Sequence, residues 1–240
     1  EGNFVIVNVG GPKGAGVVAF DVATGKPIWK TSDELASYAA PIAATIGAQR
    51  RVLVITRYQL LGLDPVDGQE IFRVPFGARG PTVNGASPVL IGDSALLTAS
   101  YGIGAKFVRL AAKSATVTWE NELLSSQYTT PIVYQGLVYG IDGRQDGGPV
   151  SLKCFDPIPQ KLIWEQDGLV YATLIAAGDQ LLVMQTDGIL RVVALGKAQY
   201  VEKANLKLMP GTTRALPALA NGRLYIRNER MLACFDLRGE

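Results

Sequence analysis

The sequence predicts an all-β protein, a β-propeller made of four-stranded antiparallel blades. Two sequence patterns lead to this prediction: a strand–turn–strand phrase and a proline-led hairpin, each recurring about every 40–50 residues. No stretch has the 3.6-residue hydrophobic period of a convincing helix, and only residues 33–39 come near one. Four short strands per period are typical of a propeller blade, so the 240 residues hold about six repeat units.

The first pattern is clearest at Ala19–Trp29, which reads AFDVATGKPIW. A short apolar strand ends at Asp21, and turn residues follow up to Gly25. A second apolar strand then begins and carries Trp29. The phrase therefore predicts two antiparallel strands joined by a tight turn.

Copies of this phrase continue along the chain. The copy at residues 62–72 begins 43 residues after the first and has Gly68 and Phe72 at the positions of Gly25 and Trp29. Less complete copies end at Trp119 and Trp164, a shortened copy lies near residues 193–195, and the last copy begins with Cys234-Phe235-Asp236.

The second pattern is a residue pair ending in proline, followed by a short apolar segment, a glycine and another apolar run. These prolines are Pro41, Pro88, Pro131 and Pro217, and their steps of 47, 43 and 86 residues match one, one and two periods. Proline at the first residue of a strand removes no ladder hydrogen bond, so this placement suits a sheet. The two patterns together predict a single propeller domain with units near residues 1–30, 41–73, 88–120, 131–165, 173–202 and 217–240.

The phrase Ala-x-Asp-x-x-Thr-Gly-x-x-x-Trp at Ala19–Trp29 resembles the repeat of the pyrroloquinoline-quinone-type (PQQ-like) β-propeller family, over essentially the whole chain. The closing Cys234–Arg238 is similar to the end of secreted bacterial PQQ-like repeat proteins of unassigned activity. The resemblance implies that each Trp docks between neighbouring blades, near the small residue and the Gly of an adjacent motif. The residues implied in this docking are Ala19, Gly25, Trp29, Gly68, Phe72, Trp119 and Trp164.

The resemblance also implies a ring that is commonly eight-bladed. The first unit lacks its proline-led strand and the last lacks its Trp-bearing strand, so we expect about two further blades upstream. N-terminal blades of the same precursor, or a second chain, would then complete the ring. A self-contained six-bladed ring is the rival interpretation. By the same resemblance, the expected location is the bacterial periplasm or the cell exterior.

Composition disfavours several classes of function. The chain has 23 Lys and Arg against 21 Asp and Glu, which leaves no electrostatic footprint for nucleic acid or an anionic membrane. The apolar runs are strand-sized, far shorter than the roughly 20 residues of a membrane helix. The chain contains no histidine, so His-based acid–base catalysis, Ser-His-Asp triads and His-ligated metals are excluded.

The repeated polar residues are expected to be structural. Asp21, Asp64, Asp156 and Asp236 each end a strand before a turn, which favours Asx-turn capping over catalysis or calcium binding, and we expect no metal site. Cys154 and Cys234 hold the same motif position two units apart, which is too far for a disulfide in a propeller. We expect both cysteines to be free and buried.

The candidate binding residues lie in the connections between units, because in a propeller these connections cross from the outer edge to the central channel and gather on one face. Their last residues before the next unit are expected to ring the mouth of a central channel, and they are Tyr38, Asn84, Tyr128, Tyr171 and Arg214. Aromatic residues and Arg are favoured where surfaces bind a partner. The long connections 77–84 and 203–213 could fold over the entrance, whereas the Gly-rich segment 140–149 is a hairpin that we assign to a different surface.

Two functions remain open at this point. The first is a non-catalytic envelope scaffold that binds another envelope protein or a polysaccharide and needs no cofactor. The alternative is a PQQ- and calcium-dependent quinoprotein dehydrogenase with its cofactor at the channel mouth, in which Asn84 and Arg214 would serve. No adjacent Cys-Cys pair of the kind expected near such a cofactor is present, which favours the scaffold.

Overall fold

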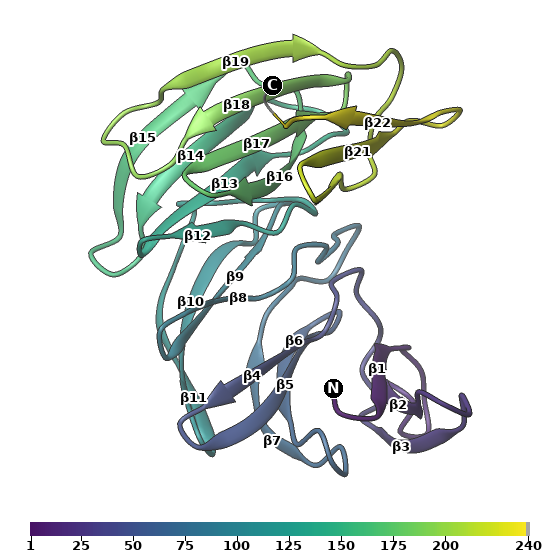
Figure 1. Cartoon of the computed structure of the whole chain (residues 1–240). Coiled ribbons are helices and arrows are strands. Elements are labelled where there is room, and N and C mark those ends of the chain that lie inside the picture. Colours follow the sequence, from purple (N-terminus) through teal and green to yellow (C-terminus); the bar gives the residue numbers. More distant parts are fainter. Residues whose placement is uncertain (239–240) are drawn as a thin grey trace. The chain divides into compact units, whose positions relative to one another are not determined.

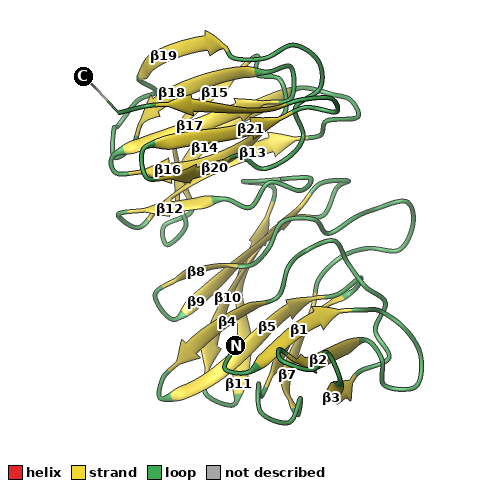
Figure 2. Ribbon diagram, turned by 45° about the vertical axis from the view of Figure 1, so that its right-hand side comes forward, coloured by secondary structure: helices red, strands yellow, loops and turns green. Residues whose placement is uncertain are grey.

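The computed structural model describes residues 1–238, and over this range the chain contains 22 strands and no helix (Figures 1 and 2). The prediction of an all-β chain is confirmed. The strands form six antiparallel sheets of three or four strands, in keeping with a propeller, whereas the size of the ring stays a prediction. The chain divides into two compact units, Glu1–Tyr128 and Thr129–Glu240.

Three sheets make up the first unit. The first sheet has three strands, β1 (Phe4–Asn8), β2 (Val17–Asp21) and β3 (Pro27–Thr31). The second sheet has four, β4 (Ile42–Ile46), β5 (Gln49–Ile55), β6 (Gln59–Leu63) and β7 (Glu70–Pro75). The third also has four, β8 (Val89–Ile91), β9 (Ser94–Ala99), β10 (Gly104–Ala111) and β11 (Ser114–Asn121).

The second unit also contains three sheets. The fourth sheet comprises β12 (Ile132–Tyr134), β13 (Leu137–Gly143), β14 (Val150–Asp156) and β15 (Lys161–Asp167). The fifth comprises β16 (Ala172–Ala177), β17 (Gln180–Gln185), β18 (Ile189–Ala194) and β19 (Glu202–Lys207). The sixth has three strands, β20 (Ala218–Ala220), β21 (Arg223–Arg227) and β22 (Leu232–Asp236).

Each sheet is a meander, in which every strand pairs with the next one along the chain. Apolar side chains on both faces of the central strands explain why the sheets stack: β9, for example, is buried along its whole length. Val17, Trp29, Val54 and Leu61 belong to one core cluster shared by the first and second sheets. A similar cluster, including Leu190 and Leu224, joins the fifth and sixth sheets.

The last strand of each of the first five sheets carries a β-bulge where it pairs with the strand before it, and the extra residue in β3 is Ile28. In the first sheet the register shifts just after Ala19, which pairs with Trp29. The equivalent shifts follow Gly62, Phe107, Cys154 and Val192. A bulge bends its strand and increases the local twist, so each repeat turns its last strand at the position of the Trp.

The two ends of every sheet differ in what they carry. One end, called here the Asp-turn end, holds the turns that follow the repeated phrase, such as residues 22–26 and 64–69. The other end, called the connection end, holds the connections between sheets, such as residues 32–41 and 208–217. In an antiparallel meander, the hairpins between the strands before the bulge, such as residues 144–149 and 228–231, also lie at the connection end.

No helix long and apolar enough to cross a membrane occurs among residues 1–238.

Candidate functional site

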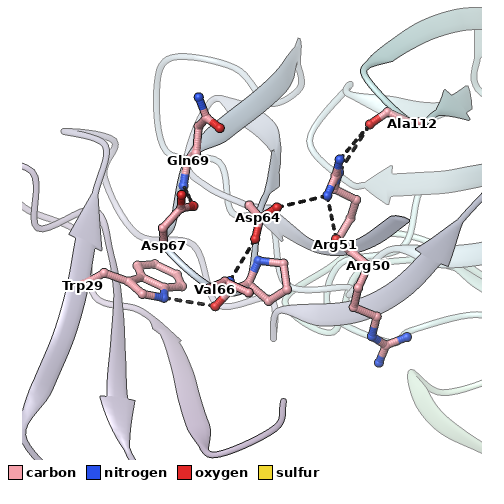
Figure 3. A network of polar contacts seen from close by, with 9 residues as sticks. Trp29, Arg50, Arg51, Asp64, Val66, Asp67, Gln69 and Ala112 are labelled. Atoms are coloured by element: carbon pink, nitrogen blue, oxygen red, sulfur yellow. Dashed lines mark hydrogen bonds and ion pairs between the residues drawn. The ribbon is translucent and has the colours of Figure 1, made fainter. Parts of the chain in front are cut away.

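Trp29 lies against the Asp turn of the neighbouring sheet (Figure 3). Its indole Nε1 donates a hydrogen bond to the Pro65 carbonyl at 3.0 Å, and the side chain is 8% exposed. A Cβ on Gly68 would lie 2.5 Å from the indole ring, so only glycine allows this approach. Gly68 also has a φ of +75°, in the left-handed region that glycine adopts without strain.

The carboxylates of the Asp residues that begin these turns accept hydrogen bonds from backbone amides two or three residues later in the same turn. The carboxylate of Asp64 accepts from the amide of Val66 at 2.9 Å, and that of Asp156 accepts from the amide of Ile158 at 3.0 Å. Asp21 accepts from both the amide and the hydroxyl of Thr24 at 2.7 Å. The Thr24 hydroxyl bond, followed by the amide bond, lowers the pKa of Asp21. These carboxylates form Asx turns, as the sequence predicted.

Arg51 is a joint that sequence reasoning missed. Phe72 occupies the position of Trp29 in the second sheet, but a phenyl ring has no hydrogen-bond donor. The buried Arg51 supplies donors instead: its Nη2 reaches the Ala112 carbonyl in the turn of the third sheet at 3.0 Å. The same guanidinium pairs with Asp64 at 3.2 Å (Figure 3). The repeated motif gives no sign that Arg51 replaces the Trp donor. The signal in the sequence is an arginine in β5, the strand that pairs with the motif strand β6.

Trp164 repeats the Trp29 contact inside the second unit. Its Nε1 donates to the Lys197 carbonyl at 3.1 Å, in the turn between β18 and β19. The ring lies 5.8 Å from the Tyr139 ring and 5.6 Å from the Tyr200 ring, centroid to centroid. The Tyr139 hydroxyl accepts from the Gly196 amide in the same turn at 2.8 Å.

Of the other implied docking residues, Ala19, Phe72 and Trp119 lie in strands, and Gly25 lies in the turn between β2 and β3. Ala19 is fully buried opposite Trp29, and Gly25 has a φ of +68° with open space around it. Phe72 covers Gly62 of its own sheet, where a Cβ would lie 2.2 Å from the ring. Trp119 stacks on Phe107 with ring centroids 5.4 Å apart.

At the connection end of the first unit, Tyr38 has an exposed side chain on a fixed backbone. Its side chain is 81% exposed, whereas its amide donates to the Asn84 carbonyl at 3.0 Å. The neighbouring Ser37 hydroxyl donates to the Ile55 carbonyl at 2.5 Å and accepts from the side chain of Asn8 at 3.2 Å. The aromatic ring is therefore presented to solvent from a backbone that is held by hydrogen bonds.

Asn84, expected at the channel mouth, turns inward. It is 1% exposed, and its Nδ2 donates to the carbonyls of Thr56 and Arg57 at 3.0 and 3.1 Å. Its amide group fastens the connection to the hairpin of the same sheet. Tyr128, in the same unit, is half-buried, and its Cβ lies within 2.8 Å of the position that a Cβ on Gly85 would take.

Tyr171 is also buried rather than displayed. It is 1% exposed, and its hydroxyl accepts a hydrogen bond from the amide of Thr129 at 3.1 Å. Arg214, by contrast, is exposed and follows Thr213, whose amide donates to the Thr186 carbonyl at 2.8 Å. Of the five expected binding residues, Tyr38 and Arg214 thus present exposed side chains, and Asn84 and Tyr171 do not.

Arg214 borders two hollows in the second unit. One, of about 150 Å³ and called here the Arg214 hollow, is lined by Thr212, Arg214, Ala215, Arg227, Asn228 and Glu229. The other, of about 440 Å³, is lined by Gln145, Val170, Thr186, Asp187, Gly211, Thr212 and Arg214. Gln145 belongs to the hairpin that we assigned to a different surface. That assignment was wrong, because the β13–β14 hairpin shares one surface with the Arg214 connection.

The expectation that both cysteines are free and buried is wrong for one of them. Cys154 is free and fully buried, but the free Cys234 is exposed. Cys234 lies on β22, the edge strand of the sixth sheet, where no fourth strand covers it among the described residues. Burial raises the pKa of the Cys154 thiol to about 11, and burial raises the pKa of its neighbour Tyr139 to about 12.

The residues suggested for a quinone and calcium do not form a fitting set. The Nδ2 of Asn84 is used by backbone carbonyls, and its Oδ1 is buried without a hydrogen-bond donor. Among residues 1–238, no group of three or more Cys, Asp and Glu side chains could hold a metal ion.

The family model described as outer membrane protein assembly factor BamB matches residues 13–99 and 63–240. The chain belongs to this family. The predicted resemblance to PQQ-like repeat propellers is thereby confirmed. No curated protein sequence matches this BamB-family chain.

Solved structures support the fold of this BamB-family chain. BamB from Moraxella catarrhalis is 16% identical, with a TM-score of 0.54 over 96% of this chain and 80% of that one. The computationally designed Ika8 protein is 15% identical, with a TM-score of 0.67 over 98% and 68%. Hsv2 from Kluyveromyces lactis is 14% identical, with a TM-score of 0.63 over 99% and 78%. Identities this low show the fold alone.

Proposed function

We propose that this chain is a non-catalytic protein-interaction module of the bacterial periplasm, which binds another envelope protein through the connection end of its sheets. Membership of a family described as outer membrane protein assembly factors supports both the location and the kind of partner.

The observation that carries the proposal is an exposed aromatic side chain on a hydrogen-bonded backbone at the connection end. Tyr38 is 81% exposed on a hydrogen-bonded backbone, and Leu35 in the same connection is 55% exposed. In the second unit, Leu216 is 67% exposed beside Arg214. An aromatic side chain on a backbone that is already hydrogen-bonded loses little backbone entropy on binding, and such residues are typical interface anchors. No specific observation favours the dehydrogenase alternative.

Site-specific photo-crosslinking in the native bacterium tests the proposal. A photoreactive amino acid is placed at Tyr38 or Leu216 and, as matched controls, at Val66 or Ile158, which are 72% and 75% exposed in Asp turns. We expect adducts with one envelope protein at the first two positions and not at the controls. Equal adducts at all four positions, or binding of purified polysaccharide without any protein adduct, would contradict the proposal.

A further inference from the structure

The second unit carries an unusual group of arginines at its connection end. Arg191, Arg223 and Arg238 of this unit each have a carboxylate within 4.0 Å. Arg214, Arg227 and Arg230 are exposed and have no ion pair with any residue in the range 1–238. Two of these three, Arg214 and Arg227, line the same Arg214 hollow.

The backbone around the Arg214 hollow is held from both sides. Arg227 ends strand β21, and Asn228 directly after it donates from Nδ2 to the Pro210 carbonyl at 2.7 Å. The Oδ1 of Asn228 accepts from the amides of Arg230 and Met231 at 2.8 and 2.7 Å, which closes the hairpin turn. These bonds tie the β21–β22 hairpin to the 208–217 connection, so the segments that carry Arg227 and Arg214 are joined by hydrogen bonds.

Two guanidinium groups that line one small hollow are chemically suited to an anion. Each guanidinium offers a planar fork of N–H donors that matches the two oxygens of a carboxylate. Glu229 also lines the hollow and has no cationic partner within 4.0 Å among residues 1–238, so the formal charge of the three side chains is positive by one unit. A monoanion such as a carboxylate balances this charge, whereas a phosphate dianion would leave the hollow with a net negative charge.

We infer that the Arg214 hollow binds a carboxylate of the partner protein, supplied by an acidic side chain in an extended segment. This inference rests on the proposed function, and it specifies a carboxylate as the group of the partner protein that contacts the Arg214 hollow. The exposed Val170 and Leu216 lie in the connections that border the hollows, and they would contact apolar residues next to the acidic one.

Fluorescence anisotropy with a labelled acidic peptide tests the inference. The probe is the amidated peptide Gly-Asp-Leu-Asp-Leu-Gly, and its partner probe has Asn in place of Asp. We expect the acidic peptide to bind and the Asn peptide to bind at least about tenfold more weakly, because charge-assisted hydrogen bonds are lost. A version of the Asn peptide with a free C-terminus tests whether a C-terminal carboxylate binds the hollow as well as an Asp side chain does. If only that version binds, the inference of an acidic side chain is overturned.

Matched variants separate a specific site from general charge. Arg214→Gln and Arg227→Gln should each raise the Kd at least about tenfold. Arg223→Gln lies on the same strand as Arg227 and removes the same charge, but it should change the Kd by less than about threefold. Glu229→Gln should lower the Kd, because a like charge leaves the hollow.

The inference would be overturned if the acidic peptide did not bind, or if Arg223→Gln raised the Kd as much as Arg214→Gln and Arg227→Gln do. It would also be overturned if inorganic phosphate displaced the peptide more effectively than acetate when the two are compared at the same ionic strength. The unfolding midpoints of all variants should stay near that of the wild type, since the substituted side chains are exposed. If Leu216 still crosslinks to a protein while the arginine variants bind the peptide normally, the proposed function stands and the carboxylate site falls.

Discussion

The Asp-turn end and the connection end of the sheets treat their polar groups in opposite ways. At the Asp-turn end, Trp29, Arg51 and Trp164 each donate to a backbone carbonyl of the neighbouring sheet. At the connection end, Arg214 and Arg227 have no carboxylate partner within residues 1–238. The difference indicates that these three side chains hold neighbouring sheets together, whereas the two connection-end arginines remain available for binding.

The largest expected effect comes from removing an inter-sheet indole. Trp29→Ala should lower the free energy of unfolding by about 3–5 kcal/mol, because a large buried side chain leaves a cavity between two sheets. Urea unfolding measures this. As a control, Trp29→Phe keeps most of the volume and loses the bond to Pro65, so it should cost about 1 kcal/mol. An alanine variant as stable as the wild type would show that the indole is not a joint.

Gly68 and Gly25 allow a paired comparison at one motif position. Both have left-handed φ values, +75° and +68°, so alanine is strained at either site by about 1 kcal/mol. Only at Gly68 would the new Cβ meet the Trp29 ring, at 2.5 Å. Gly68→Ala should therefore cost about 1–3 kcal/mol more than Gly25→Ala in the same urea titration. Equal costs would mean that the indole moves aside freely.

Arg51 and Arg50 offer a third pair on strand β5. Arg51→Gln should destabilise the chain by about 1.5–3 kcal/mol, because the buried guanidinium bonds the Ala112 carbonyl and Asp64. Arg50→Gln removes an exposed, solvent-screened pair with Glu1 and should cost clearly less than Arg51→Gln. The free energy of unfolding from urea titration distinguishes them. If Arg50→Gln costs as much as Arg51→Gln, the joint to the third sheet is not formed.

The reactivity of the two cysteines should show whether strand β22 is an exposed edge of the sixth sheet. In the folded protein a maleimide should label Cys234 and leave Cys154 unlabelled, because Cys154 is buried and its thiol has a pKa of about 11. Cys154 should react once the chain is unfolded. Mass spectrometry of the labelled peptides checks both statements. Folded protein that labels only Cys154 would contradict the exposed position of β22.

The same pKa shifts predict a small fall in stability at alkaline pH. The folded state keeps the Cys154 thiol and the Tyr139 hydroxyl protonated above their ordinary pKa values of 9.0 and 10.0. The unfolded state therefore loses protons first, and unfolding becomes easier as pH rises from about 9 to about 12. Unfolding midpoints of Cys154→Ser should show a weaker dependence over this range than those of the wild type.

The repeated part of this fold could be predicted from the sequence, and the binding surface only in part. Asp64 and Trp29 follow a local pattern in which one phrase specifies strand, turn and joint, so their positions were foreseeable. The inward turn of Asn84 depends on the carbonyls of Thr56 and Arg57, which lie 28 and 27 residues away in the chain. Side-chain direction in a connection is decided by such distant acceptors, and residue type alone does not reveal it.

The shared surface of the 140–149 hairpin and the Arg214 connection could have been derived from topology. In an antiparallel meander the hairpin between the second and third strands, here β13 and β14, lies at the same end as the connections that follow the last strands, and the Arg214 connection follows the last strand β19. The exposure of Cys234 has a similar origin, because β22 is an edge strand in the described residues although its motif matches that of the buried Cys154.

The central claim is that residues at the Asp-turn end hold the sheets together, whereas the arginines at the connection end bind a partner. The most direct test measures the Kd of the acidic peptide and the unfolding midpoint in two variants of the second unit. Trp164→Phe removes the bond to the Lys197 carbonyl, and Arg214→Gln removes an unpaired charge. We expect Trp164→Phe to unfold about 1 kcal/mol more easily with an unchanged Kd for the acidic peptide. Arg214→Gln should keep the wild-type unfolding midpoint and bind at least about tenfold more weakly. The reverse result, weaker binding in Trp164→Phe and normal binding in Arg214→Gln, would contradict the account.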